Sequence, residues 1–321
     1  MEMMKTNGVI GADVPRIDGI AKVTGAARYG ADFHLSRLAF ACLVTSPIAL
    51  GKIREIDDSH ARAVPGVLEI LTHRNVGKAI KPGSPMLDGG NMASSVAPLE
   101  SENIHFAGQI VAVVIAGALE SAQEGAERLS ISYDVQTPVA TFDCPGLKEV
   151  KAKAIGESEI ETGHFTKAFA AAVTTVDAWY DTPPQHHNPM ELFQTTCSWD
   201  GDDLTVWESS QSVRGYQHGL ARQLGISATH VHVISPFIGG AFGSRGELAQ
   251  STALVALAAK RLGQPVKLVA TRRQGFTLRT FRAETRQHMQ LGADADGRLT
   301  ALFHEGWELT SRDDGFRIGG N

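Results

Sequence analysis

A glycine-rich segment is the sharpest candidate for chemistry in this sequence. It reads Ile-Gly-Gly-Ala-Phe-Gly-Ser-Arg over residues 238–245, after an apolar run at 231–235 and before a helix-forming run. Glycines let the backbone approach a ligand closely and expose a row of N–H groups, which suits phosphate or another anionic oxygen group. The segment is neither a Walker A loop, since no Gly-Lys-Ser/Thr follows, nor a GxGxxG loop. Taken alone, it is more typical of a glycine-rich turn around a buried Phe242.

Two other segments carry polar side chains that can face a ligand. Gln211 lies between a predicted strand and a predicted helix, where its amide can donate and accept hydrogen bonds; taken alone it is more typical of a surface glutamine. Residues 185–191 include the adjacent His186 and His187, which suggest a metal. However, neighbouring residues rarely face one ligand on a regular element, and Pro189 marks a turn. A structured turn in which Glu191 pairs internally is therefore the favoured interpretation.

Cysteine usage provides no framework for a metal or for disulfides. Cys42, Cys144 and Cys197 are widely spaced and form no CxxC pair, so their spacing indicates neither a zinc nor an iron–sulfur site. An odd number excludes a complete disulfide framework. We expect a reducing compartment.

Apolar periodicity predicts the elements that must position these segments. Strands are expected at residues 38–46, 53–56, 67–72, 106–116, 131–135, 174–180, 194–198, 204–209, 231–235, 266–271 and 299–309. Helices are expected at residues 60–63, 119–129, 213–224 and 251–262, the last two ending at Gly225 and Gly263. The alternation of strands and helices favours an α/β or α+β first domain, and a mixed stretch with Pro145-Gly146 predicts a linker.

In this order, the features resemble the large, molybdenum-binding subunit of the xanthine dehydrogenase/aldehyde oxidase family. The matching segments are Lys22–Asp32, Val64–Val67, Phe106–Ala112, Asn188–Glu191, Gln211 with the 238–245 segment, and Gly263–Leu268. Each match is weak by itself, but together they follow the family's order and spacing over almost the whole chain. Ala241 is a mild departure, since glycine is common there.

The resemblance implies an α+β fold with defined boundaries. It implies an N-terminal segment and α/β hammerhead domain over residues 1–137, a linker over 138–160, and the first part of a molybdopterin-binding domain over 161–321. It also implies which residues meet the cofactor. Gln211 would hydrogen-bond an oxo ligand of molybdenum, and the backbone of the loop would lie against the pterin. The loop residues implied are Gly239, Gly240, Phe242 and Gly243. The resemblance assigns no catalytic residue and no metal-ligating side chain to this chain.

The function implied is that of an oxidoreductase, a molybdenum hydroxylase acting on aldehydes or N-heterocycles. Its cofactor would be molybdopterin-bound molybdenum, in the plain or the cytosine dinucleotide form. A [2Fe–2S] subunit and an FAD subunit are the expected partners. Family subunits continue well beyond this point, and their active-site glutamate lies in that later part. We therefore expect this chain to be incomplete, inactive alone and completed by a further chain. The alternatives are a non-catalytic fragment or partner-binding scaffold and an unrelated nucleotide-binding protein.

Charge and hydropathy argue against two other classes of partner. The chain has 30 Lys and Arg against 35 Asp and Glu, a net charge of −5, which makes it a poor candidate for nucleic-acid binding. Its apolar stretches are far shorter than the roughly 20 residues that span a bilayer, and the first residues lack the apolar core of a signal peptide. We expect a cytoplasmic protein with no membrane partner, reaching the periplasm only with an exported partner.

Overall fold

A mixed β-sheet forms the centre of the computed structural model, which describes residues 11–83, 96–150 and 161–309. In this part of the chain the sheet has seven strands in the order β10-β9-β8-β11-β1-β5-β3. The strands are β1 (Ala39–Thr45), β3 (Val67–Thr72), β5 (Ile110–Ala116), β8 (Gln194–Asp200), β9 (Asp203–Trp207), β10 (Val231–Ile234) and β11 (Val266–Val269). Every residue of β5 is buried, as its unbroken apolar run predicts.

The pairing of β1 with β11 joins segments from the N-terminal and C-terminal parts of the chain. These strands run parallel, with Ala39 opposite Val266, and β1 also pairs antiparallel with β5. One apolar core therefore contains residues from both sides of the predicted linker, including Leu43, Val113 and Leu254. The sheet is continuous across the predicted domains.

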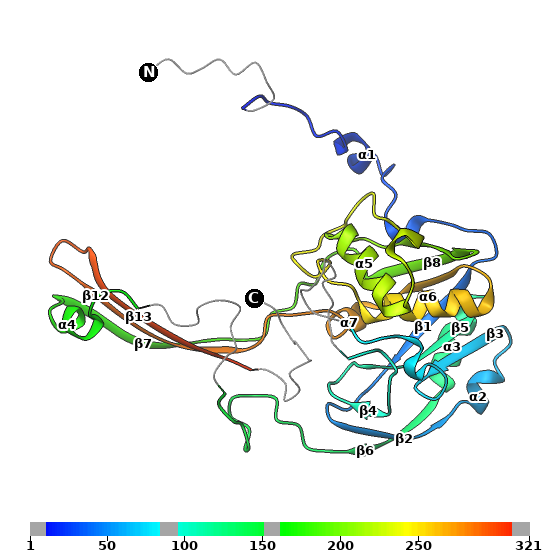
Figure 1. Cartoon of the computed structure of the whole chain (residues 1–321), viewed down its shortest axis with the longest axis horizontal. Helices are drawn as coiled ribbons and strands as arrows, with labels where there is room; N and C mark the ends of the chain where they lie inside the picture. The colour runs from blue at the N-terminus through cyan, green and yellow to red at the C-terminus, as the bar shows by residue number, and fades with distance from the viewer. Residues whose placement is uncertain (1–10, 84–95, 151–160, 310–321) are drawn as a thin grey trace.

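A smaller sheet and two helices lie beside the main sheet and together with it form the body of the molecule (Figure 1). The sheet contains β2 (Gly51–Asp57), β4 (Asn103–Ile104) and β6 (Ser130–Val135), and the helices are α2 (Ser59–Arg62) and α3 (Leu119–Arg128). Gly125 lets α3 approach the main sheet, because a Cβ there would lie 2.9 Å from Cγ1 of Val114. This second core includes Ile53, Ile56 and Ile70.

A long antiparallel arm projects from one side of the body (Figure 1). It consists of β7 (Thr174–Thr182), β12 (Thr285–Ala293) and β13 (Leu299–Glu308), with α4 (Phe165–Ala170) near its far end. Aromatic contacts stabilise it: Trp179 stacks on His288 with ring centroids 4.6 Å apart, and Trp307 lies 5.4 Å from Trp179. Several apolar side chains on the arm remain exposed, among them Leu302 at 60%.

Helices α5 (Val213–Leu224) and α6 (Gln250–Leu262) pack against the main sheet, and α7 (Arg272–Gly275) follows β11. Helix α1 (Gly19–Val23) precedes β1 and lies apart from the sheet (Figure 1). Short 3₁₀ turns occur at Gly30–Asp32, Gly77–Ala79 and Ala228–His230. Gly225 and Gly263 end α5 and α6 at φ values of +69° and +60°, which confirms both expected glycine caps.

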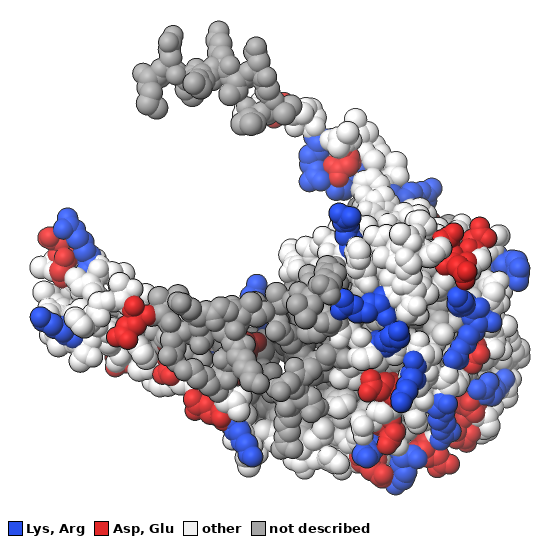
Figure 2. Space-filling model, viewed as in Figure 1, with Lys and Arg blue, Asp and Glu red and all other residues white. Residues whose placement is uncertain are grey.

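Among the described residues no helix is long and apolar enough to cross a bilayer. Figure 2 shows acidic and basic side chains interspersed over the visible face of the body.

The cap of α6 makes a test of this helix geometry. We predict that Gly263→Ala lowers the free energy of unfolding by about 1 kcal/mol, because a side chain disfavours the left-handed conformation. Space is not the issue, since a Cβ at Gly263 meets nothing within 4 Å. Urea denaturation of the chain measures the change. Gly117→Ala is the matched control, because Gly117 is equally open but lies outside the left-handed region. Equal stabilities of the two variants would contradict the assigned cap.

Candidate functional site

The predicted site residues meet where two parallel strands end. Strands β9 and β10 pair in parallel, with Trp207 opposite Ile234, so the chain leaves both strands at one edge of the sheet. Gln211 follows β9, and the glycine loop (residues 239–243) follows β10. The two segments are hydrogen-bonded: the Gln211 N–H donates to the Arg245 carbonyl at 2.9 Å, and the Arg245 N–H donates to Gln211 Oε1 at 3.3 Å.

The glycine loop has a backbone that most side chains would not permit. Gly240 and Gly243 have φ values of +99° and +103°, and Phe242 has a φ of +54°. Gly239 is needed for space, since a Cβ there would lie 2.6 Å from the Cβ of Glu191. Phe242 is 75% exposed, so the interpretation of a turn around a buried phenylalanine is wrong. A non-glycine residue in the left-handed region costs of order 1 kcal/mol or more, which the surrounding contacts must offset.

Glu191 connects the glycine loop to the segment Glu208–Gln211, which we call the Gln211 turn. Its carboxylate accepts from the Gly239 N–H at 2.8 Å and from Ser209 Oγ at 2.6 Å. Its own N–H donates to the Gly239 carbonyl at 3.0 Å. The expected pairing of Glu191 within the protein is confirmed, although its partners lie in other segments and the only turn or bend in residues 185–191 is a bend at 190–191.

Arg245 is the residue that sequence reasoning missed, having noted it only as the end of the loop. It is fully buried. Its Nε donates to the Gly240 carbonyl at 3.0 Å, and Nη2 donates to the carbonyls of Glu191 at 2.8 Å and Leu192 at 3.2 Å. Burial lowers the pKa of Arg245, and the negative charge of Glu191, 3.4 Å away, opposes that effect. A charged residue in an otherwise small-residue loop is the signal that was available.

A buried ion pair lies beneath the Gln211 turn. Glu208 accepts from Arg279 Nη2 at 2.9 Å, and both side chains are almost fully buried. The hydroxyls of Thr195 and Thr252 each donate to Glu208 Oε2 at 2.7 Å. Tyr216 donates to the Glu247 carbonyl at 2.7 Å, and burial raises the pKa of Tyr216 to about 12. This network fixes the residue that begins the Glu-Ser-Ser-Gln turn.

The histidine pair borders a cavity next to the loop. The cavity, about 190 Å³, is lined by Gln185, His186, His187, Phe242 and Arg282. Burial lowers the pKa of both histidines, which favours the neutral imidazoles. His186 stacks on Phe281, with ring centroids 5.1 Å apart. In the described ranges no three His, Cys, Asp or Glu side chains come together as a metal site.

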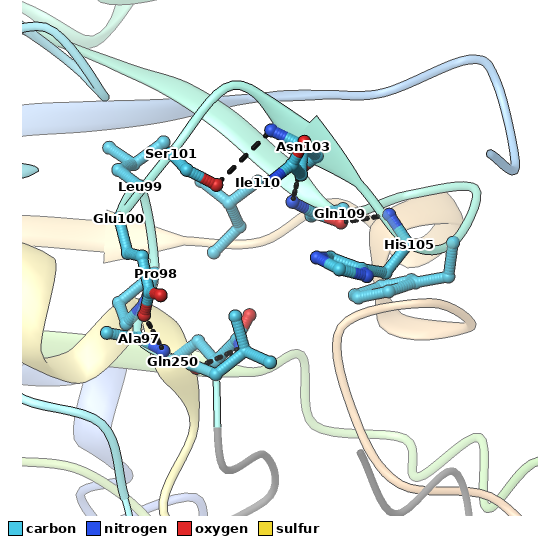
Figure 3. Close-up of a pocket in the computed structure, with 12 residues that line it drawn as sticks. Ala97, Pro98, Leu99, Glu100, Ser101, Asn103, His105, Gln109, Ile110 and Gln250 are labelled. Atoms are coloured by element: carbon cyan, nitrogen blue, oxygen red, sulfur yellow. Dashed lines mark hydrogen bonds between the residues drawn. The ribbon is translucent and has the colours of Figure 1, made fainter. Parts of the chain in front are cut away.

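A second pocket is too small to hold a cofactor or a substrate. It measures about 10 Å³ and lies between residues 96–110 and Gln250 of α6 (Figure 3). That volume is close to that of one water molecule. Gln109 closes it internally by donating to the Asn103 carbonyl and accepting from the His105 N–H. The residues around this pocket therefore pack the protein interior and do not form a ligand site.

Comparison with known proteins decides the family. A family model described as the molybdopterin cofactor-binding domain matches residues 147–311, half of the chain. A second model, the aldehyde oxidase and xanthine dehydrogenase a/b hammerhead domain, matches residues 24–137. The chain belongs to the aldehyde oxidase and xanthine dehydrogenase family. The expected α+β fold, a hammerhead domain followed by part of a molybdopterin-binding domain, is confirmed.

Relatives within this family are longer than this chain. The aldehyde oxidoreductase molybdenum-binding subunit PaoC of Escherichia coli (strain K12) is 33% identical over 305 residues, which cover 93% of this chain and 40% of PaoC. The nicotine 6-hydroxylase large subunit of Paenarthrobacter nicotinovorans is 28% identical. The crystal structure of quinoline 2-oxidoreductase from Pseudomonas putida 86 matches 92% of this chain and 39% of its own, with a TM-score of 0.81 and 25% identity. The chain thus spans about 40% of the curated relatives it matches.

The site offers backbone and side-chain donors that suit a cofactor with anionic oxygens, such as the one that the family model names. Gly239 leaves no space for a side chain, and the positive φ values of Gly240 and Gly243 suit a backbone that presents its N–H groups to a ligand. Gln211 is exposed and uses its carbonyl oxygen within the protein, which leaves its amide nitrogen to donate outward. Arg245 Nη1 is buried and has no hydrogen-bond partner among the described residues. The roles of Gln211, Gly239, Gly240, Phe242 and Gly243 toward the cofactor stay predictions.

The buried Glu208–Arg279 ion pair can be tested for its contribution to stability beneath the site. We predict that Arg279→Met lowers the free energy of unfolding by about 3–5 kcal/mol, because it leaves the Glu208 carboxylate buried without its cation. Adding Glu208→Gln to Arg279→Met should recover part of that loss, since the amide needs no counter-charge. Denaturant titration of Arg279→Met, Glu208→Gln and the double variant, beside the wild type, closes a double-mutant cycle. If Arg279→Met and the double variant are equally unstable, the charge of Glu208 is not what the arginine neutralises.

Proposed function

We propose that this chain forms one wall of the molybdenum cofactor site in an oxidoreductase that hydroxylates aldehydes or N-heterocycles. The observation that supports this proposal is the meeting of the Gln211 amide and the glycine loop at one edge of the sheet. Family membership alone would not require these residues to meet, and their contact makes a common surface for one ligand.

In this proposal the chain binds and orients the cofactor and does not transfer protons. Gln211 accepts from the Arg245 N–H through Oε1, so the amide is held in one orientation and Nε2 is the group that donates to an oxygen of the bound cofactor. The N–H groups of Gly240, Phe242 and Gly243 would line the pterin. When bound, the cofactor supplies a Lewis-acidic metal that activates an oxygen nucleophile and accepts electrons. Gln211 is neither an acid nor a base, so it acts on orientation alone.

The names of the relatives support a proposal for the substrate class and the partners. These include an aldehyde oxidoreductase, a xanthine dehydrogenase, a nicotine hydroxylase and a quinoline oxidoreductase, most of them named as subunits or large subunits. We propose aldehydes or N-heterocycles as substrates. The proposed partners are an iron–sulfur subunit, an FAD subunit and a polypeptide equivalent to the part of the relatives that this chain does not span. The proposed pterin is molybdopterin or its cytosine dinucleotide form, and the proposed compartment is the cytoplasm.

Molybdenum content tests the cofactor proposal directly. The chain would be purified from a host that makes the cofactor, alone and co-expressed with the products of neighbouring genes, and its metal would be measured by mass spectrometry. We expect near-stoichiometric molybdenum in the co-expressed complex. Absence of the metal from both samples would overturn the proposal and favour a non-catalytic scaffold.

Gln211 makes the sharpest mutational test. We predict that Gln211→Ala lowers turnover by the complex about 10–100-fold, the range typical of losing an outer-shell hydrogen bond at a metal site. The melting temperature of the chain should change little, because the side chain is exposed and the hydrogen bond that it accepts from the Arg245 N–H is long, at 3.3 Å. Gln123→Ala, at an exposed position on α3 far from the site in sequence, is the matched control. Unchanged turnover at equal molybdenum content would refute the assignment of Gln211.

A further inference from the structure

We infer that Glu191 and Arg245 are positioning residues, which together fix the spacing between Gln211 and the glycine loop. The meaning of that spacing for a cofactor rests on the proposed function, whereas the spacing itself is a property of the chain. On the sequence, Glu191 was expected only to pair within the protein, and Arg245 was given no role.

The glycine loop does not hold its own first half. The residues that directly follow the loop bond only its second half: the Ser244 N–H and Oγ donate to the Ala241 carbonyl, and the Gly246 N–H donates to the Gly243 carbonyl. Within the described residues, the backbone hydrogen bonds of Gly239 and Gly240 run to Glu191 and Arg245. The first half is therefore placed from outside the loop.

Glu191 bridges the loop and the turn in a single side chain. One carboxylate oxygen accepts from Gly239 N–H at 2.8 Å, and the other accepts from Ser209 Oγ at 2.6 Å. Ser209 lies two residues before Gln211, so a change in the carboxylate moves both segments. Charge-assisted hydrogen bonds of this kind are the strong ones in a protein interior.

Arg245 provides a second connection between Gln211, the glycine loop and Glu191. Its backbone N–H and carbonyl pair with Gln211, and its side chain bonds the carbonyls of Gly240, Glu191 and Leu192. Only a guanidinium, with donors fixed in a fork, reaches these carbonyls simultaneously. The ring of the neighbouring Phe193 lies 4.8 Å from the guanidinium carbon and adds a cation–π contact.

The experiment compares removal of these groups with their conservative replacement. Glu191→Ala and Arg245→Met would be made beside Glu191→Gln and Arg245→Lys in the full chain. Lys267→Met is the matched control: Lys267 is 5% exposed and donates to the carbonyls of Ala31 and Phe33 at 2.7 Å, neither of which belongs to the loop. Two quantities would be measured, the hydrogen exchange rate of amides 239–245 and the molybdenum retained by the co-expressed complex after dialysis.

We expect amide exchange in residues 239–245 to rise at least about tenfold in Glu191→Ala and Arg245→Met, as the loss of a buried charged hydrogen bond implies. Glu191→Gln and Arg245→Lys should give smaller increases, because each keeps part of the hydrogen bonding. Lys267→Met should affect residues 29–33 and leave the loop unchanged. In the complex, the two severe variants should retain less molybdenum than wild type.

The outcomes separate this inference from the proposed function. Wild-type exchange rates of the loop in Glu191→Ala and in Arg245→Met would overturn the inference, whatever the metal content. A looser loop in a complex that never holds molybdenum would leave the inference standing and refute the proposed function. If the severe variants fail to fold, the conservative pair decides: wild-type exchange in both Glu191→Gln and Arg245→Lys overturns the inference.

Discussion

A buried guanidinium must find acceptors, and the candidate site is arranged around that requirement. Arg245 has no access to water, so desolvation of its charge has to be offset by hydrogen bonds and an anion nearby. The carbonyls it uses come from the glycine loop and from residues 191–192, and the anion is Glu191. Segments more than 50 residues apart in sequence are thereby brought to one point.

The main sheet determines where that point lies. Parallel pairing of β9 with β10 sends both following loops to one edge, and antiparallel pairing of β8 with β9 and β11 brings residues 191–193 beside them. The parallel contact between β1 and β11 then continues the sheet into the hammerhead region. Positions in the site consequently depend on a core shared by both regions, and a change in either region can reach the site through the sheet.

The sequence predicts those elements whose burial follows from a continuous apolar composition. The fully buried β5 and the apolar, glycine-capped α6 follow from composition and local conformation alone. Strand β12 was missed because its polar residues are stabilised across the sheet: His288 pairs with Asp177 at 2.7 Å and stacks on Trp179, which no local period reveals. Gln211 and the glycine loop stood out from the residues themselves, and the family resemblance supplied only their expected roles toward the cofactor. Arg245 was missed because its partners are distant in sequence.

The strain in the glycine loop explains why distant partners are needed there. Phe242 has a positive φ and a mostly exposed ring, so its side chain contributes little apolar burial to offset that backbone conformation. A loop of this composition would sample other conformations if only its own hydrogen bonds held it. Glu191 and Arg245 remove that freedom before any ligand arrives. A preorganised backbone loses less conformational entropy on binding, and this gives the buried charges a function in binding as well as in folding.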